Sequence, residues 1–167
     1  MLKNKMKRIQ KGHAGRQAGF TLIELLIVIL IISILAVTVF VALNPVKRFA
    51  DARDSKRYTD VETILTAVHE SIVDNGGTVP AGITTTEKQL GTSATLCNTT
   101  NCTTPPTAAA CLDLSTTLAA YLKKMPVDPR VGTAAITGYK IVQDANGIVT
   151  VSACSSESAT AQISASR

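Results

Sequence analysis

An acidic side chain lies near the start of the longest apolar stretch of the sequence. Of the 24 residues from 20 to 43, only four are polar, and one of these is Glu24. A carboxylate inside a membrane helix costs roughly 2.5–3.5 kcal/mol on insertion scales, so it persists where it reaches the membrane surface or has a cationic partner. Cleavage between Gly19 and Phe20 would supply such a partner, because the new α-amino group of Phe20 in a staggered neighbouring chain would lie beside Glu24. Both explanations fit a position one turn into the stretch.

The apolar stretch is long enough to cross a lipid bilayer. As a helix it would span about 36 Å, against a hydrocarbon core of about 30 Å. The apolar region of a secretory signal is shorter, about 7–15 residues, so we expect residues 20–44 to remain in the mature protein as a transmembrane helix. Residues 1–19 hold six basic side chains and no acidic one. This is typical of a basic leader peptide on the cytoplasmic side of a single-pass span.

The charge of the chain is concentrated in that leader. The whole sequence has a net charge of +5, but without residues 1–19 it has 11 basic and 12 acidic residues, a net charge of −1. Direct nucleic-acid binding is therefore not predicted. The sequence has no phosphate-binding glycine loop and no metal-ligand cluster, and His69 has the pattern of an exposed helix residue. We predict no cofactor and no enzymatic activity.

The C-terminal half contains four cysteines. They are Cys97, Cys102, Cys111 and Cys154. An even number in an oxidising compartment favours two disulfides, with three pairings open. A metal site is less favoured, because the four form no Cys-x-x-Cys pair and the two histidines are far away in sequence. Our preferred pairing is Cys97–Cys102 with Cys111–Cys154.

The residues around the apolar boundary form a specific motif. The string Gly19-Phe20-Thr21-Leu22-Ile23-Glu24, after a basic leader and before a long apolar helix, resembles the cleavage and methylation motif of type IV prepilins and type II secretion pseudopilins. In that family a membrane aspartic protease, the prepilin peptidase, cuts after the glycine and methylates the new N-terminal Phe. The resemblance implies that Gly19 precedes the cut, Phe20 becomes the methylated N-terminus and Glu24 is the assembly carboxylate. Many major pilins carry a proline in mid-span, whereas the first proline here is Pro45.

The resemblance also implies a function and partners. The chain would be a structural subunit that polymerises, with copies of itself and related minor subunits, into a type IV pilus or pseudopilus for adhesion, motility, DNA uptake or secretion. A prepilin peptidase, an assembly platform protein and an ATPase would act on it, first in the inner membrane and then in an extracellular or periplasmic filament. The alternative is a single-span anchored extracytoplasmic protein that does not polymerise. That alternative does not explain Glu24 or the junction after Gly19.

Residues 45–75 have the pattern of an amphipathic helix. Apolar residues recur at steps of three and four, and Asn75-Gly76-Gly77 provides a stop. Joined across Pro45, the two stretches predict one helix of about 55 residues, roughly 80 Å long. The charged run 51–57 is interpreted as a solvated helix face, with lateral subunit contacts as the alternative.

Residues 76–154 predict a small globular domain. A Thr-rich loop (76–111) is followed by a short amphipathic helix over Leu114–Met125, with Pro126 ending it. The strands 139–143 and 148–153 then form a β-hairpin.

Two further segments have weaker patterns. A strand is expected near 134–137, and residues 155–167, which are poor in apolar side chains, are expected to form a flexible tail. Together the elements predict an α+β fold of pilin-like form, in which a long N-terminal helix packs on a small antiparallel sheet.

The C-terminal domain resembles, more loosely, that of major pseudopilins. Members of that group can hold calcium in a loop of this domain, which makes Asp128 and Asp144 candidate ligands. Two carboxylates without a recognisable calcium-loop pattern make a poor site. Turn formation is the preferred explanation of both residues.

Overall fold

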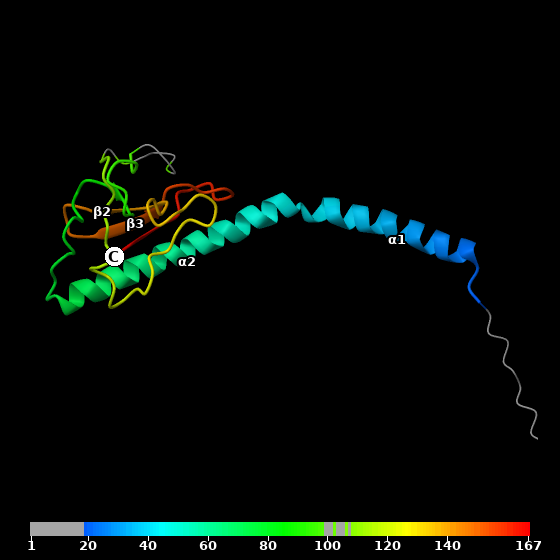
Figure 1. The fold of residues 1–167 in the computed structure, drawn as a ribbon, viewed down its shortest axis with the longest axis horizontal. Coiled ribbons are helices and arrows are strands. Elements are labelled where there is room, and N and C mark those ends of the chain that lie inside the picture. Colours follow the sequence, from blue (N-terminus) through cyan, green and yellow to red (C-terminus); the bar gives the residue numbers. More distant parts are fainter. Residues whose placement is uncertain (1–18, 99–101, 103–105, 107) are drawn as a thin grey trace, which may run out of the picture. The chain divides into compact units, whose positions relative to one another are not determined.

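The computed structural model describes residues 19–98, 102, 106 and 108–167. The leader residues 1–18 therefore lie outside the described part. The elements are α1 (Leu22–Leu43), α2 (Pro45–Asp74), β1 (Lys88–Gln89), β2 (Tyr139–Gln143), β3 (Val149–Ala153) and β4 (Ser164–Ser166) (Figure 1). The chain divides into two compact units at Leu43/Asn44. A long apolar helix, a second helix and a small four-stranded antiparallel sheet confirm the predicted α+β, pilin-like class.

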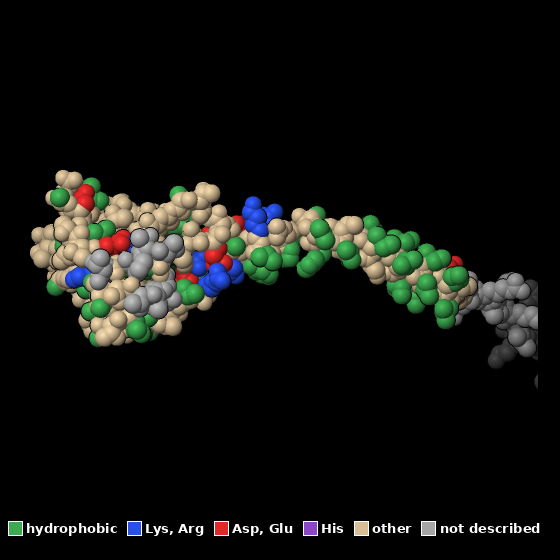
Figure 2. All heavy atoms as spheres, turned by 90° about the horizontal axis from the view of Figure 1, so that it is seen from above, with side chains coloured by type: hydrophobic (Ala, Val, Ile, Leu, Met, Phe, Trp, Pro, Cys, Tyr) green, Lys and Arg blue, Asp and Glu red, His purple; other side chains and the backbone are tan. Residues whose placement is uncertain are grey.

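Helix α1 is apolar on every side. Its 22 residues span about 33 Å, and none of them is buried within the chain (Figure 2). Among the described residues it is the one helix with the length and composition to cross a membrane. A helix that packs on its own domain has one apolar face, whereas a helix that is apolar all round needs an apolar environment from outside the chain.

The two helices are separated at Asn44, so the single continuous helix expected from the sequence is wrong. Asn44 has φ 42° and ψ 72°, in the left-handed region that Asn tolerates better than most residues. Proline disfavours an α-helical conformation in the residue before it, which ends α1 at Leu43. The Asn44 Oδ1 accepts a hydrogen bond from the Lys47 N–H at 3.4 Å, and Pro45 occupies the first helical position, where no N–H is needed.

The core of the second unit lies between α2 and one face of the sheet. The α2 side chains at three- and four-residue steps are buried, as the sequence predicts, and so are the alternating side chains of β2 and β3. The main α2 and sheet residues of this core are Val61, Ile64, Leu65, Val68, Tyr139, Ile141, Val149, Val151 and Ala153.

The predicted hairpin is confirmed. Strands β2 and β3 pair with Tyr139 opposite Ala153 and Ile141 opposite Val151. The turn between them is held by Asp144, whose Oδ1 accepts hydrogen bonds from the N–H groups of Asn146 and Ile148, each at 2.8 Å.

Two of the weaker predicted elements, a helix and a strand, are wrong. Leu114–Met125 forms successive turns instead of a helix, although the Leu118 N–H does bond the Leu114 carbonyl at 2.9 Å and both leucines are buried. Ser and Thr within this short segment favour local turns over helix, and so short a helix is marginal by itself. Residues 134–137 are likewise a bend and not a strand, closed by the Thr133 N–H bonding the Ile136 carbonyl at 2.8 Å.

The expectation of a flexible tail over 155–167 is also wrong. Strand β4 extends the sheet by pairing with β3, with Ser152 opposite Ser164 and Thr150 opposite Ser166. Ile163, one of the few apolar residues of the segment, is completely buried. A low apolar content did not prevent folding, because backbone pairing and one buried side chain fix the segment.

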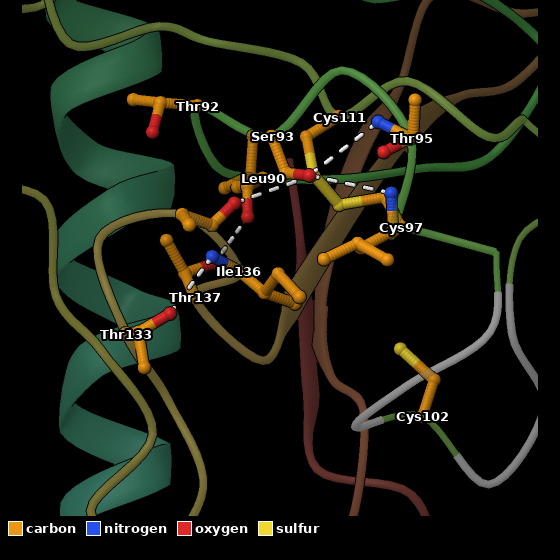
Figure 3. The surroundings of a disulfide bond; sticks show 12 residues. Leu90, Thr92, Ser93, Thr95, Cys97, Cys102, Cys111, Thr133, Ile136 and Thr137 are labelled. Atoms are coloured by element: carbon orange, nitrogen blue, oxygen red, sulfur yellow. Dashed lines mark hydrogen bonds between the residues drawn. A yellow bond between two sulfur atoms is a disulfide. The ribbon is translucent and has the colours of Figure 1, made fainter.

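The disulfides differ from the preferred pairing, which is wrong. Cys97 is bonded to Cys111, and Cys102 to Cys154. The segments on either side of the loop run together, since the Cys97 N–H bonds the Ala109 carbonyl and the Cys111 N–H bonds the Ser93 carbonyl. This pairing sets the Cα atoms of Cys97 and Cys111 5.2 Å apart, with Cys102 lying away from them (Figure 3). One bond therefore closes the loop and the other ties it to the end of β3.

Candidate functional site

The predicted cleavage site lies in the irregular segment before α1. Gly19 and Phe20 precede the helix, and the Phe20 side chain is 89% exposed. Gly19 does not adopt a left-handed conformation, and a Cβ added to it would meet no atom within 4 Å. Nothing in the described fold therefore requires glycine at this position.

Glu24 belongs to a hydrogen-bonded cap at the start of α1. The Thr21 Oγ1 accepts from the Glu24 N–H at 3.3 Å, and the Glu24 Oε2 accepts from the Thr21 N–H at 2.8 Å and from the Thr21 hydroxyl at 2.9 Å. This reciprocal arrangement is a capping box. The sequence analysis missed it, although a Thr three residues before a Glu at the start of an apolar run is its signal.

The cap leaves part of the carboxylate available. Within the described residues every hydrogen bond of the Glu24 carboxylate ends on Oε2, so Oε1 has no partner there. The cap uses the N–H of Thr21, which a cut between Gly19 and Phe20 does not touch. The same arrangement therefore fits the chain before and after cleavage.

The other polar side chains of the span are satisfied within the helix. The Ser33 hydroxyl donates to the Ile29 carbonyl at 2.7 Å, and the Thr38 hydroxyl donates to the Leu35 carbonyl at 2.8 Å. Such bonds back to the preceding turn let Ser and Thr sit in an apolar environment. Glu24 is thus the one ionisable residue of α1, and its Oε1 is the side-chain oxygen of the helix that has no partner among the described residues.

The N-terminal architecture defines a class, and the comparisons support it. An apolar helix exposed on all sides, followed by a small α+β domain, is the architecture of a membrane-anchored, pilin-like protein. Residues 15–40 match the family described as the prokaryotic N-terminal methylation motif. This motif is the signature of type IV prepilins and pseudopilins, so the predicted resemblance at the N-terminus is confirmed. The comparisons with curated proteins and with solved structures gave no match.

A buried ionic cluster, which sequence reasoning missed, lies against the middle of α2. The side chain of Arg57 is fully buried and contacts three carboxylates. Its Nε and Nη2 donate to Asp128 at 2.6 and 3.1 Å, and its Nη1 donates to Asp54 at 2.7 Å and lies 3.0 Å from Glu157. The interpretation of 51–57 as a solvated face is therefore wrong for Asp54 and Arg57. Asp54 and Arg57 lie seven and four residues before the buried Val61, which places them on the same face of the helix, and this spacing could have indicated their burial.

The cluster fastens the C-terminal segment to α2. The Asp54 carboxylate accepts hydrogen bonds from the backbone N–H groups of Glu157, Ser158 and Ala159 at 2.7–3.1 Å. Burial alone would raise the pKa of Asp54, but these bonds and Arg57 together lower it to about 2. Hydrogen bonds from Arg53, and then from Arg57, lower the pKa of Glu157 to about 2. Both carboxylates therefore stay ionised at neutral pH, which fits a structural clamp and not an acid–base catalyst.

The two calcium candidates each have a structural role. Burial raises the pKa of Asp128, but its hydrogen bonds with Arg57 and with the Arg130 and Val131 N–H groups outweigh this and lower the pKa. Asp144 holds the hairpin turn. Within the described residues, no group of three or more metal-ligating side chains comes together. Turn formation accounts for both residues, as the sequence analysis preferred.

Proposed function

We propose that this chain is the precursor of a filament subunit of the type IV pilus or pseudopilus class. A prepilin peptidase cuts after Gly19 and methylates Phe20, with the leader on the cytoplasmic side of the inner membrane and the domain after Asn44 outside it. A platform protein and an ATPase then move the subunit from the bilayer into the filament. The observation that carries the proposal is the methylation motif at 15–40, joined to an apolar helix with one acidic side chain.

Two physical features support polymerisation over simple anchoring. An apolar helix exposed on all sides can leave the bilayer only for an environment that is equally apolar, and a bundle of identical helices provides one. The unused Oε1 of Glu24 offers a site for the Phe20 α-amino group of a staggered neighbour, which would fix the axial register. A contact between different parts of identical copies can repeat along an open helix, provided that the rotation between neighbours does not close into a ring.

A pair of substitutions separates the two roles of Glu24. Glu24→Ala removes the carboxylate, whereas Thr21→Ala removes only the capping hydroxyl and leaves the charge. In cells that contain the peptidase and the assembly machinery, we expect both variants to be cleaved and only Glu24→Ala to lose filaments in the sheared fraction. Equal loss in both variants would mean that Glu24 serves the cap alone, and normal filaments from Glu24→Ala would refute the register role.

A further inference from the structure

The two ends of α2 carry opposite charges that form no ion pair with any described residue. Lys47 and Arg48 are exposed in the first turn, and neither forms an ion pair with any described residue. Asp51, one turn further, pairs with neither of them. At the other end, Glu70 and Asp74 are exposed and likewise form no ion pair within the described part of the chain.

This charge placement is unfavourable for an isolated helix. The helix dipole favours acidic side chains at the N-terminal end and basic ones at the C-terminal end. Helix α2 has neither an acid in its first turn nor a base in its last. By contrast, the charged residues in the middle of the helix, such as Arg53, Lys56 and Arg57, are all paired. The terminal charges therefore lower the stability of α2 in the free subunit, and they are candidates for contacts with other molecules.

Apolar surface accompanies both sets of charges. Val46 and Phe49 beside the basic pair are 76% and 65% exposed, and Figure 2 shows basic and hydrophobic side chains together on this part of the molecule. Val73 beside the acidic pair is 74% exposed. It lines an open groove of about 430 Å³ with Glu70, Asp74, Tyr121 and Arg167. The Tyr121 hydroxyl donates to the Asp74 Oδ2 at 2.8 Å, and the charge of Arg167 is paired with Glu62, 3.8 Å away, so the two acids of the groove keep their excess charge.

A single chain cannot bring these two surfaces together. Lys47 and Glu70 are 23 residues apart in one helix, which places them roughly 35 Å apart along its axis. We propose that the basic turn Val46–Phe49 of one copy docks into the acidic groove at the end of α2 in a second copy. The inference rests on the proposed function, because it takes the head-to-tail contact to repeat along an open filament, as such contacts do where the rotation between copies does not close a ring.

Charge reversal at both surfaces tests the contact in the full chain, in cells with the peptidase and assembly machinery. The basic-end variant is Lys47→Glu with Arg48→Glu, and the acidic-end variant is Glu70→Lys with Asp74→Lys. Each alone places like charges across the contact, so sheared filaments should fall by roughly tenfold or more, the equivalent of about 1.4 kcal/mol. The quadruple variant restores the attraction with reversed sign and should recover filaments.

Co-expression of the two double variants gives an independent prediction. In a mixed filament, the acidic first turn of one variant meets the basic groove of the other, and the basic first turn of the second meets the acidic groove of the first. Filaments that contain both variants should therefore form where neither variant forms them alone. The matched control, Lys123→Glu with Lys124→Glu, reverses the same number of charges at another exposed site and should assemble normally.

The outcomes separate this inference from the proposed function. If the wild-type chain is cut before Phe20 and forms filaments, but the quadruple variant and the co-expressed pair do not recover, the docking contact is refuted. Loss confined to the basic-end variant would also refute it and would assign Lys47 and Arg48 to phospholipid headgroups. If the wild-type chain forms no filaments at all, the proposed function itself fails.

Discussion

Removing Arg57 should destabilise the globular unit more than removing any exposed charge. Arg57 is completely buried, and its substitution by Ala would leave the carboxylates of Asp54 and Asp128 buried without their cation. Breaking a buried pair by removing one partner costs about 3–5 kcal/mol. A domain of this size has a total stability of about 5–15 kcal/mol, so the loss is a large part of it.

The assay is urea unfolding of the full chain in mild detergent with the disulfides intact. Near-ultraviolet circular dichroism would report on the tyrosines, since Tyr139 is fully buried and its hydroxyl donates to Asp60 at 2.8 Å. With a slope of about 2 kcal/mol per M, the midpoint should fall by roughly 1.5–2.5 M.

Two further variants make the result specific. Arg130 also contacts Glu157, at 3.6 Å, but its side chain is 64% exposed, so Arg130→Ala should cost about 0–1 kcal/mol. The double variant Arg57→Met with Asp128→Asn removes a charge of each sign and should recover part of the loss. A midpoint for Arg57→Ala within 0.5 M of the wild type, on the order of 1 kcal/mol, would refute the clamp.

Three other predictions follow from the same contacts. Gly19→Ala should leave folding unchanged, because the added methyl group meets no atom within 4 Å in the described part of the chain, and it should abolish cleavage, because the proposed peptidase cuts after glycine. Gly12→Ala in the leader is the control, and immunoblots would compare the precursor with the mature form; normal processing of Gly19→Ala would contradict the prediction. The pKa values of Asp54 and Glu157 are lowered from 3.8 and 4.5 to about 2, so their stabilisation is complete above about pH 5 and is lost as the pH falls from about 4.5 to 2. One such carboxylate contributes about 2.6 kcal/mol, and urea midpoints across this range would show the loss. Arg57→Ala should reduce this loss without abolishing it, because the backbone N–H groups still bond Asp54 and Arg53 still bonds Glu157; a flat profile in the wild type would contradict the prediction. Removing Cys102–Cys154, which closes a longer loop, should cost more than removing Cys97–Cys111, about 4 against about 3 kcal/mol in the chain-entropy model. Denaturation of the two Cys→Ser double variants would compare the two losses in unfolding free energy, and equal losses would contradict the predicted order. Peptide mapping without reduction would check the disulfide pairing, and a Cys97–Cys102 peptide would contradict it.

Sequence reasoning succeeded where the pattern is local. The apolar stretch, the motif around Gly19 and Glu24, the buried stripe of α2 and the hairpin each depend on spacing within a short window. The left-handed Asn44 is also a local feature, since an Asn before a Pro is a known helix boundary. It was missed because hydrophobic periodicity continues on both sides of it.

The rest depends on contacts between distant residues. The order of Cys97, Cys102, Cys111 and Cys154 along the chain does not show that the loop folds back to join its two ends. The role of Glu157 is equally hidden, since its partners Arg53 and Arg57 lie about a hundred residues earlier. Residues 155–167, which looked too polar to fold, are held by these long-range bonds and by their pairing with β3.

The most direct test of the account is the mass of the N-terminus of the protein isolated from cells that also express its peptidase. We expect a mature chain that begins at Phe20 and carries one methyl group on its α-amino nitrogen. A chain that still begins at Met1, or one cut at a position beyond residue 36, would contradict it.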